Sequence, residues 1–453
     1  MERISTGNRN LDRILCGGLP RHSINMVMGL PGTGKTILAQ QLVFATGTAE
    51  RPALYVTTIS EPLPKVVTYL QGMRFADLDR LGREVRYHSL AEALQERPDQ
   101  LDEHIAELIQ EHRPQVIVID SFKAIMELVP EPTRWRTAVF ALAQIVTAYD
   151  LTTVWVGEYD SDAISRLPEF AVADGILQLR RTFPGSRDDR FLQVMKLRGS
   201  SFLDGEHAFT LSAAGLEVFP RLVGPPPAQR AEPVERLQTG IDGLDSMVET
   251  GWLRGTSTLV AGPSGAGKTM LGLHFLRHGV EQGEPGLLVN FQESPGQLHR
   301  AMASLGWDGE ALMAAGLDIL HTSPVELQMD TIVQEMLRRI AGRGVRRIVI
   351  DALGDLERAA ADPRRFSDYV YALTQEFASH RLTALLMLET PAGPNEQRWS
   401  GEEISYMSDN ILLLSMDMGE DLVRTIRVVK TRGSAHDGRR HVLRIGHQGI
   451  AVE

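Results

Sequence analysis

The sequence predicts two tandem α/β domains, each built on a mainly parallel β-sheet flanked by helices, with further β segments at its end. Three observations support this fold class. Short, almost continuously apolar segments alternate with longer helical patterns, as in parallel strands that are buried on both faces. A glycine-rich loop follows the first of these apolar segments in each half of the chain. The landmarks of the first half recur in the second, so the 453 residues contain two copies of one fold.

The expected elements follow the same order in both halves. In the first half, a strand leads into the glycine-rich loop, and a helix and further apolar strands follow. These elements are expected at 23–29 (strand), 36–46 (helix), and 53–57, 116–120 and 152–157 (strands). Each half then becomes rich in β-forming residues. The terminal β segments are expected at 175–179, 190–196 and 205–211 and, in the second half, at 410–414, 422–430 and 440–445.

A nearly constant spacing relates the two copies. Thr6-Gly7 and Thr239-Gly240 are 233 residues apart, as are the two glycine-rich loops, and later landmarks drift by one or two residues. The segment 223–233 has no apolar period, and its three consecutive prolines favour an extended, fairly stiff linker. We therefore expect one domain over 1–222 and the other over 234–453.

The glycine-rich loop of each half matches the phosphate-loop motif G-x-x-x-x-G-K-[ST] without a mismatch. In this motif the glycines let backbone N–H groups face a nucleotide triphosphate. The lysine reaches the β- and γ-phosphates, and the threonine hydroxyl holds Mg²⁺. ATP and Mg²⁺ are therefore the expected cofactors. The expected contact residues are Gly29, Gly32, Thr33, Gly34, Lys35 and Thr36 in the first loop, and Gly262, Ser264, Gly265, Ala266, Gly267, Lys268 and Thr269 in the second.

Two aspartates are candidates for organising the Mg²⁺ ion. Asp120 and Asp351 each end an apolar strand, the place where such a carboxylate belongs in this kind of site. We expect each aspartate to share the ion with the threonine of its own loop, Thr36 or Thr269. The alternative is that each carboxylate only caps the helix that follows its strand.

Hydrolysis also requires a group that orients or deprotonates water. The place to look for it is the end of the strand that follows the phosphate-loop helix. The first half offers Glu61 there, and the second half offers Glu293 directly after Gln292. Both glutamates are general-base candidates. The alternative is that they are solvated loop residues.

A Lys-x-Arg-Gly motif follows a strand late in each half. Its basic residues are Lys196 and Arg198 in the first copy and Lys430 and Arg432 in the second. Such a pair could reach the γ-phosphate of a neighbouring subunit and act as an arginine finger in trans, which stabilises charge in the transition state. The alternative is an ordinary surface pair, which the occurrence of the motif in both copies disfavours.

Together these motifs resemble those of the KaiC family, ATPases of the RecA/RadA superfamily, over essentially the whole chain. The resemblance rests on the phosphate loops, on the Lys-x-Arg-Gly motifs and on the opening segments of both halves, such as Gln238 to Asp245. It implies two RecA-like domains and a homohexamer of two stacked rings with ATP bound between subunits. The Lys and Arg of Lys-x-Arg-Gly would then act on the neighbour's nucleotide. Signalling or clock proteins are the further partners that the resemblance suggests.

The family can also phosphorylate itself in its second ring, on adjacent serine and threonine residues. Ser405 falls on the serine acceptor, and Tyr406 replaces the threonine. The resemblance therefore implies a serine autokinase with one acceptor retained; alternatively, Ser405 is a polar loop residue. The paired catalytic glutamates of the family are reduced to Gln292-Glu293 in the second half and to the single Glu61 in the first.

Composition and charge limit the classes of partner and the cellular compartment that we expect for the protein. The formal net charge of −11 disfavours a broad grip on nucleic acid. No apolar run approaches the roughly 18 residues that a membrane helix needs. Cys16 is the only cysteine, which fits a reducing compartment. We expect a cytoplasmic protein that has neither DNA nor a membrane as its partner.

The leading interpretation is a ring-forming ATPase with serine autokinase activity in its second domain, in a circadian-clock-type or signalling role. A nucleotide-gated scaffold with little turnover is the first alternative, because the glutamate pairs are weakened. A DNA-dependent ATPase similar to RecA and RadA is the second, because Arg180-Arg181 and the segment from Arg187 to Arg190 are locally basic.

Overall fold

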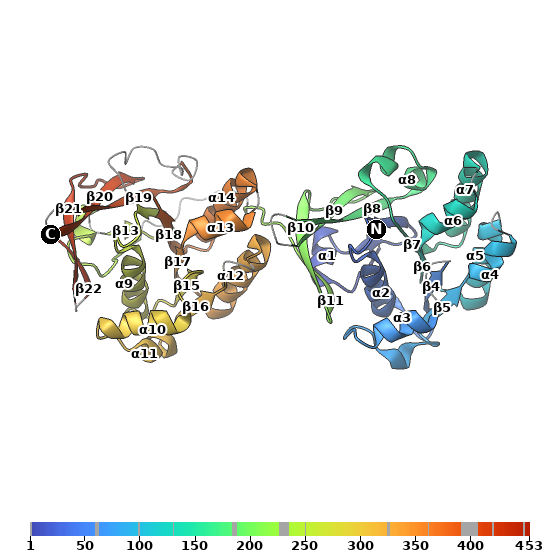
Figure 1. Cartoon of the computed structure of the whole chain (residues 1–453), viewed down its shortest axis with the longest axis horizontal. Coiled ribbons are helices and arrows are strands. Elements are labelled where there is room, and N and C mark those ends of the chain that lie inside the picture. Colours follow the sequence, from blue (N-terminus) through green and yellow to red (C-terminus); the bar gives the residue numbers. More distant parts are fainter. Residues whose placement is uncertain are drawn as a thin grey trace. The chain divides into compact units, whose positions relative to one another are not determined.

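The computed structural model divides into two compact units, Met1–Arg221 and Leu222–Glu453 (Figure 1). Both are α/β folds on a mainly parallel sheet, which confirms the predicted fold class. The expected linker falls largely within 226–234, outside the described residues, so the boundaries from the sequence stay a prediction. The structure describes residues 2–58, 63–97, 100–129, 131–183, 188–225, 235–249, 251–323, 327–360, 362–390, 406–418, 421–446 and 449–453.

The main sheet of the first unit combines a parallel part with an antiparallel extension. Its strands are β3 (Ile24–Met28), β4 (Ala53–Thr57), β5 (Val85–Ser89), β6 (Val116–Asp120), β7 (Thr152–Gly157), β8 (Gly175–Thr182), β9 (Asp189–Leu197), β10 (Glu206–Ser212) and β11 (Gly215–Phe219). They lie in the order β11-β10-β9-β8-β3-β7-β6-β4-β5. The strands from β8 to β5 in this order are parallel, and β9, β10 and β11 are antiparallel to their neighbours.

The main sheet of the second unit repeats this plan. Its strands are β14 (Ser257–Gly262), β15 (Gly286–Asn290), β16 (Leu317–His321), β17 (Arg347–Asp351), β18 (Thr383–Glu389), β19 (Asn410–Met418), β20 (Leu422–Thr431), β21 (His441–Gly446) and β22 (Gly449–Val452). Their order is β16-β15-β17-β18-β14-β19-β20-β21-β22. Again the part up to β19 is parallel and the last three strands are antiparallel.

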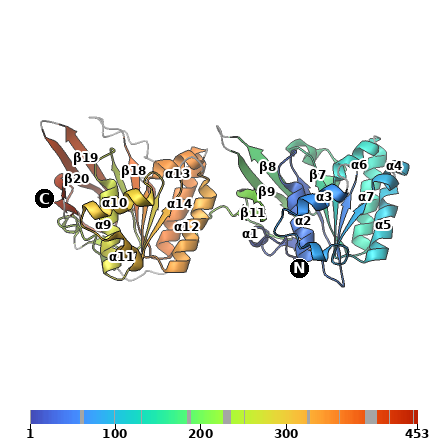
Figure 2. The same cartoon turned by 60° about the horizontal axis from the view of Figure 1, so that its bottom comes forward.

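Helices cover both faces of each sheet (Figure 2). The first unit has α1 (Arg9–Ile14), α2 (Lys35–Thr46), α3 (Leu63–Leu70), α4 (Ala91–Glu96), α5 (Leu101–His112), α6 (Phe122–Leu128), α7 (Pro132–Ala148) and α8 (Pro168–Val172). The second has α9 (Lys268–Glu281), α10 (Pro295–Ser304), α11 (Gly309–Ala314), α12 (Met329–Arg343), α13 (Leu353–Ala360) and α14 (Pro363–Ser379). No helix in the described part of the chain is both long and apolar enough to cross a membrane.

The alternation of side chains along a strand gives each sheet two hydrophobic cores. In β6, Val118 packs into the core on the α2 face, whereas Ile117 and Ile119 pack into the core on the α7 face. All three side chains are buried. A strand that serves two cores must be apolar at nearly every position, which explains the continuous apolar runs in the sequence.

The repeated Thr-Gly and Asp landmarks make the same local structure in both units. The backbone N–H of Thr6 donates to Asp12 Oδ1 at 2.8 Å, and that of Thr239 donates to Asp245 Oδ1 at 2.8 Å. This turn follows the short strands β1 (Arg3–Ile4) and β12 (Arg236–Leu237), which pair with β2 (Leu19–Pro20) and β13 (Trp252–Leu253). The duplication therefore extends to hydrogen bonds at the domain entry.

The predicted core elements agree with the structure closely. The strands expected at 53–57, 116–120 and 152–157 are β4, β6 and β7 with the same ends, and the helix expected at 36–46 is α2. The strands β5 and β11 were not predicted. Because β5 is an edge strand with polar and half-buried residues, its sequence lacks the apolar run that marks the central strands.

Candidate nucleotide site

Each phosphate loop connects the central strand of its sheet to a helix. In the first unit, β3 ends at Met28, and α2 begins at Lys35 after Gly34 adopts a left-handed conformation with φ of 99°. Gly267 plays the same part before α9, with φ of 101°. A residue with a Cβ rarely adopts this conformation, so glycine at this position lets the loop turn directly into the helix. The free N–H groups at the helix start then point at the loop, as in anion sites.

The two loop lysines lie over their own loops. Lys35 Nζ donates to the carbonyl of Leu30 at 2.9 Å, and Lys268 Nζ donates to the carbonyls of Gly262 and Pro263, both at 2.8 Å. Burial lowers the pKa of both ammonium groups, whereas nearby carboxylates raise it. Each ammonium is therefore a partly desolvated cation at the mouth of an N–H-rich loop, where a phosphate would be bound strongly.

The structure brings each predicted metal aspartate onto the threonine of its loop. The Thr36 hydroxyl donates to Asp120 Oδ2 at 2.8 Å, and the Thr269 hydroxyl donates to Asp351 Oδ2 at 2.7 Å. The residues come from α2 and β6, or α9 and β17, which are far apart in sequence. Hydroxyl and carboxylate oxygens are the hard ligands that Mg²⁺ prefers, so both pairs fit the ion.

Glu293 lies beside the second of these pairs. Its backbone N–H donates to Asn290 Oδ1 at 2.8 Å, which fixes the turn after β15. Its side chain is half-buried, and within the described residues its Oε2 is buried without a hydrogen-bond partner. Burial, together with the charge of Asp351, raises the pKa of the carboxyl. Such a group is suited to accept a proton. Glu61, its predicted counterpart, lies outside the described residues.

The residue before Glu293 is also held in place. Gln292 Nε2 donates to Asp355 Oδ2 at 3.0 Å, and this buried carboxylate also accepts a hydrogen bond from Arg358. The second site thus has a neutral amide where the first glutamate of a catalytic pair would stand. Its position is set by α13.

Each site contains a further carboxylate that the sequence motifs did not indicate. Met28, the last residue of β3, pairs with Gly157 of β7, so Glu158 follows at the end of the sheet where the first phosphate loop begins. In the second unit, Gly262 at the end of β14 pairs directly with Glu389 of β18. Both glutamates are exposed, and their charges act on Lys35 and Lys268, respectively. The signal for them was present, since Glu389 ends β18 and Glu158 directly follows β7, the strands next to the two loop strands. It becomes readable only once the strand order is known.

An arginine from the antiparallel extension supports each loop, and it was also missed. Arg190 donates to the carbonyl of Gly32 at 2.8 Å, and Arg424 donates to the carbonyl of Gly265 at 2.9 Å. Gly32 and Gly265 occupy the same place in their loops. Strands β9 and β20 therefore each fix a phosphate loop to the rest of the sheet.

The parts of the first site surround a single cavity of about 720 Å³. The cavity is large enough for a nucleotide, since ligand pockets typically span about 300–1,000 Å³. Besides the predicted loop residues and Asp120, it is lined by side chains that the sequence did not single out. These include Tyr55, Tyr69, Lys123, Glu127 and Glu158.

The Lys-x-Arg-Gly motifs lie at the opposite end of the sheet from their own phosphate loops. The N–H of Arg198 donates to the carbonyl of Asp174, whose carboxylate accepts from the N–H of Ile24 at the start of β3. The phosphate loop begins only after the five residues of β3, a distance of roughly 15 Å along the strand. Arg432 shows the same connection, through Asp409, to Ser257 at the start of β14.

The side chains of these motifs are held by nearby carbonyls. Lys196 Nζ donates to Phe170 at 3.4 Å, and Lys430 Nζ donates to Ser408 at 2.7 Å. The side chains of Arg198 and Arg432 are 55% and 56% exposed. Arg198 also pairs with Asp174 at 3.4 Å, and Arg432 pairs with Asp409 at 3.9 Å. Both guanidinium groups therefore lie partly exposed, far from the phosphate loops of their own domains.

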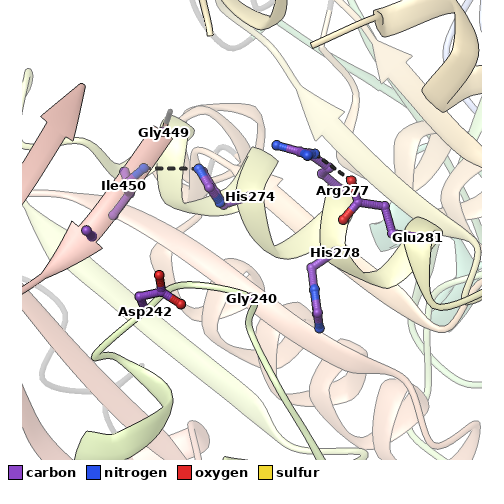
Figure 3. Close-up of a pocket in the computed structure, with 9 residues that line it drawn as sticks. Gly240, Asp242, His274, Arg277, His278, Glu281, Gly449 and Ile450 are labelled. Atoms are coloured by element: carbon purple, nitrogen blue, oxygen red, sulfur yellow. Dashed lines mark hydrogen bonds and ion pairs between the residues drawn. The ribbon is translucent and has the colours of Figure 1, made fainter. Parts of the chain in front are cut away.

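A second cavity, of about 280 Å³, lies in the second unit beside α9 and β22 (Figure 3). On its wall, the ring of His274 accepts a hydrogen bond from the N–H of Ile450 at 3.0 Å and stands edge-on to Trp307. In the first unit the matching residue Gln41 accepts from the N–H of Leu216 at 2.9 Å. A side chain of the phosphate-loop helix thus holds the last strand of the sheet in each unit.

This contact predicts a pH-dependent stability of β22. Burial lowers the pKa of His274 to about 4, whereas an unfolded histidine titrates near 6.5. The unfolded chain therefore takes up the proton first, so the stabilisation is complete above about pH 6.5 and is lost as the pH falls toward 4. We expect a loss of about 2–3 kcal/mol. Hydrogen exchange of peptides that contain Ile450 should report it.

His274→Gln is the matched variant for this test, because glutamine keeps an acceptor and does not titrate. It should remove most of the pH dependence of the protection of β22, measured as the exchange rate relative to the intrinsic rate at each pH. Peptides from β11, held by Gln41, serve as the internal control and should change little. The same acid-induced exchange at β22 in both proteins would contradict the assignment to His274.

The fold and the site define a class: two tandem phosphate-loop nucleotide-binding domains, each with a Thr–Asp pair suited to Mg²⁺. A sequence model of the family described as "ATPase: KaiC" matches residues 4–223 and again 237–453. The chain therefore belongs to the KaiC ATPase family, which confirms the resemblance noted from its motifs.

Curated relatives agree over nearly the full chain. The circadian clock oscillator protein KaiC of Thermostichus vulcanus is 31% identical, with 96% of this chain and 86% of the relative covered. The KaiC of Picosynechococcus sp. is 29% identical, with 100% and 90% covered. KaiC 1 of Synechocystis sp. is 28% identical, with 99% and 88% covered. These proteins are similar along their length, so both domains have counterparts in them.

Proposed function

We propose that this chain is a ring-forming, cytoplasmic ATPase in which each domain binds Mg-ATP and a neighbouring subunit completes the site. The observation that carries the proposal is the position of the Lys-x-Arg-Gly residues. Arg198 and Arg432 lie at the amino ends of β3 and β14, whereas the phosphate loops follow the carboxyl ends. Since these arginines are remote from the loops of their own domains, another subunit is the natural place for them to act.

The residues of the second site divide the work of hydrolysis. Lys268 and the loop N–H groups bind the phosphates, and Thr269 with Asp351 would hold Mg²⁺. When bound, the ion neutralises charge that develops on the transferred phosphoryl group. Glu293 accepts a proton from the attacking water, for which its raised pKa is suited. The first site has the same loop and Thr–Asp pair, with Glu61 as its general-base candidate.

Subunits that each contribute a loop at one end and a finger at the other associate head to tail. Such heterologous contacts form either an open filament or, if the rotation closes, a ring. The family supports the ring, with six subunits. The similar proteins described above are circadian clock oscillator proteins, so we propose a clock-type or signalling output with other proteins as partners.

Mixing two variants whose second sites are impaired in different ways tests the action in trans. In the second domain, Lys268→Ala lacks the phosphate-loop cation but keeps the finger, and Arg432→Ala lacks the finger but keeps the loop. The two full-length proteins are combined without nucleotide so that subunits can exchange, and Mg-ATP is then added. We expect ATP hydrolysis above the average of the two proteins measured separately. Turnover equal to that average would contradict action in trans.

A second candidate function is a nucleotide-gated scaffold, which the Gln292–Asp355 contact favours because a neutral amide replaces a carboxylate there. Slow turnover with tight Mg-ATP binding would support it. The structure gives less support to DNA binding. Three of the basic residues that suggested DNA are paired with acids: Arg180 with Glu206, and Arg181 and Arg190 with Asp188. Arg187 lies outside the described residues.

Serine autophosphorylation of the second domain is part of the proposal. Its acceptor Ser405 lies outside the described residues, so the assignment stays a prediction from the resemblance. Support comes from the neighbouring Tyr406, whose carbonyl accepts a hydrogen bond from Arg432 at 2.9 Å. The chain next to Ser405 is thus in contact with the proposed finger.

A further inference from the structure

The carboxylate of Asp120 has a second hydrogen-bond donor, which has no counterpart among the described residues of the second domain. The hydroxyl of Tyr55 donates to Asp120 Oδ2 at 2.5 Å, and the same oxygen accepts from Thr36 at 2.8 Å. Tyr55 lies on β4 and is 1% exposed. A buried tyrosine hydroxyl needs a partner, and here that partner is the carboxylate proposed to organise Mg²⁺.

The strand register shows what stands at this place in the second unit. Tyr55 pairs with Val118, which is two residues before Asp120, and Leu288 pairs with Val349, which is two residues before Asp351. Leu288 thus occupies the position of Tyr55 but carries no donor. The two sites share their loops and Thr–Asp pairs and differ in this hydroxyl.

We propose that Tyr55 is a positioning residue for the Mg²⁺ site of the first domain, because its hydroxyl holds the Asp120 carboxylate in the orientation that Thr36 also requires. The inference rests on the proposed function of this site. A carboxylate with two fixed hydrogen bonds has little freedom to rotate, so less orientational entropy is lost when it engages an ion. Partners of this kind commonly change metal affinity about 10- to 100-fold when they are removed.

Tyr87 provides a matched control, because it is a second tyrosine in the same cluster. Its ring stacks on that of Tyr55 with centroids 4.9 Å apart, and in the described part of the chain its hydroxyl has no hydrogen-bond partner. Tyr87→Phe and Tyr55→Phe remove the same atom from neighbouring rings. Only Tyr55→Phe removes a hydrogen-bond donor from Asp120.

The experiment measures metal binding rather than turnover. All proteins are full-length and carry Lys268→Ala, so that the first site accounts for most of the binding of metal and nucleotide. Mn²⁺ replaces Mg²⁺ as the probe, and free Mn²⁺ is followed by electron paramagnetic resonance in the presence of a non-hydrolysable ATP analogue. We expect Tyr55→Phe to weaken Mn²⁺ binding about 10-fold. Tyr87→Phe should leave it unchanged, and binding of the analogue without metal should be equal in all three proteins.

Each other outcome overturns a defined part of this scheme. Equal Mn²⁺ affinity in Tyr55→Phe and its parent would overturn the role of Tyr55 and leave the proposed function intact. Loss of analogue binding without metal in Tyr55→Phe would show that the hydroxyl serves only packing, which also overturns the inference. A parent that binds no Mn²⁺ with the analogue would overturn both the inference and the proposed nucleotide site.

Discussion

Replacing Lys268 by alanine is expected to reduce ATP hydrolysis by the second domain at least about 100-fold, because preorganised charges that face a transferred phosphoryl group contribute several kcal/mol. The lysine is the cation at the mouth of the loop, held by the carbonyls of Gly262 and Pro263. Lys35→Ala should do the same to the first domain. Phosphate release by each single variant and by the double variant separates the two sites.

The same proteins test the kinase prediction. If the second site drives autophosphorylation, phosphopeptide mapping after incubation with Mg-ATP should find phosphate on Ser405 in the native chain and in Lys35→Ala, but not in Lys268→Ala. Arg338→Ala is a suitable control, because Arg338 is an exposed residue of α12 that pairs only with Glu335 in the described contacts. Full hydrolysis by the double lysine variant would contradict the assignment of both loops.

Glu293→Gln is expected to lower turnover of the second domain by about 10²- to 10⁴-fold while ATP binding is retained, because the variant keeps the size of the side chain and loses its basicity. Measurements in a Lys35→Ala background isolate this domain. Burial and Asp351 raise the pKa of Glu293. Only the ionised carboxylate accepts a proton, so the rate should rise with pH as Glu293, whose pKa burial raises, loses its proton.

The pH profile distinguishes a base from a structural residue. The acidic limb of the profile should disappear in Glu293→Gln. Glu310→Gln is the matched control, because Glu310 is an exposed glutamate in the first turn of α11. Unchanged turnover in Glu293→Gln would contradict its role as general base and favour Glu389, whose charge acts on Lys268, as the next candidate.

Much of the site could be predicted because its signals are local. The phosphate loops are contiguous motifs, and Asp120 and Asp351 end apolar runs that are easy to recognise as strands. Glu158, Glu389 and Tyr55 could not be found in this way, because their relation to the site depends on which strands are neighbours and in what register. Arg190 and Arg424 depend in addition on the antiparallel extension of the sheet.

The role of the Lys-x-Arg-Gly motif could also be predicted only in part from the sequence. The sequence predicted a finger for a neighbouring subunit, but not the reason why it cannot serve its own domain. That reason is the reversal between β8 and β9, which returns Arg198 to the amino end of β3. Glu61 and Ser405 lie outside the described residues and remain predictions from the sequence.

The phosphate loop and the proposed arginine finger lie at opposite ends of each sheet, and this bears on when the protein would hydrolyse ATP. If the arginines act in trans as proposed, a solitary chain would bind ATP but hydrolyse it slowly. Newly made or dissociated subunits would therefore hydrolyse little ATP, and efficient hydrolysis would begin only once the ring has closed. On the proposed function, the reversal between β8 and β9 would thus couple ATP hydrolysis to completion of the ring.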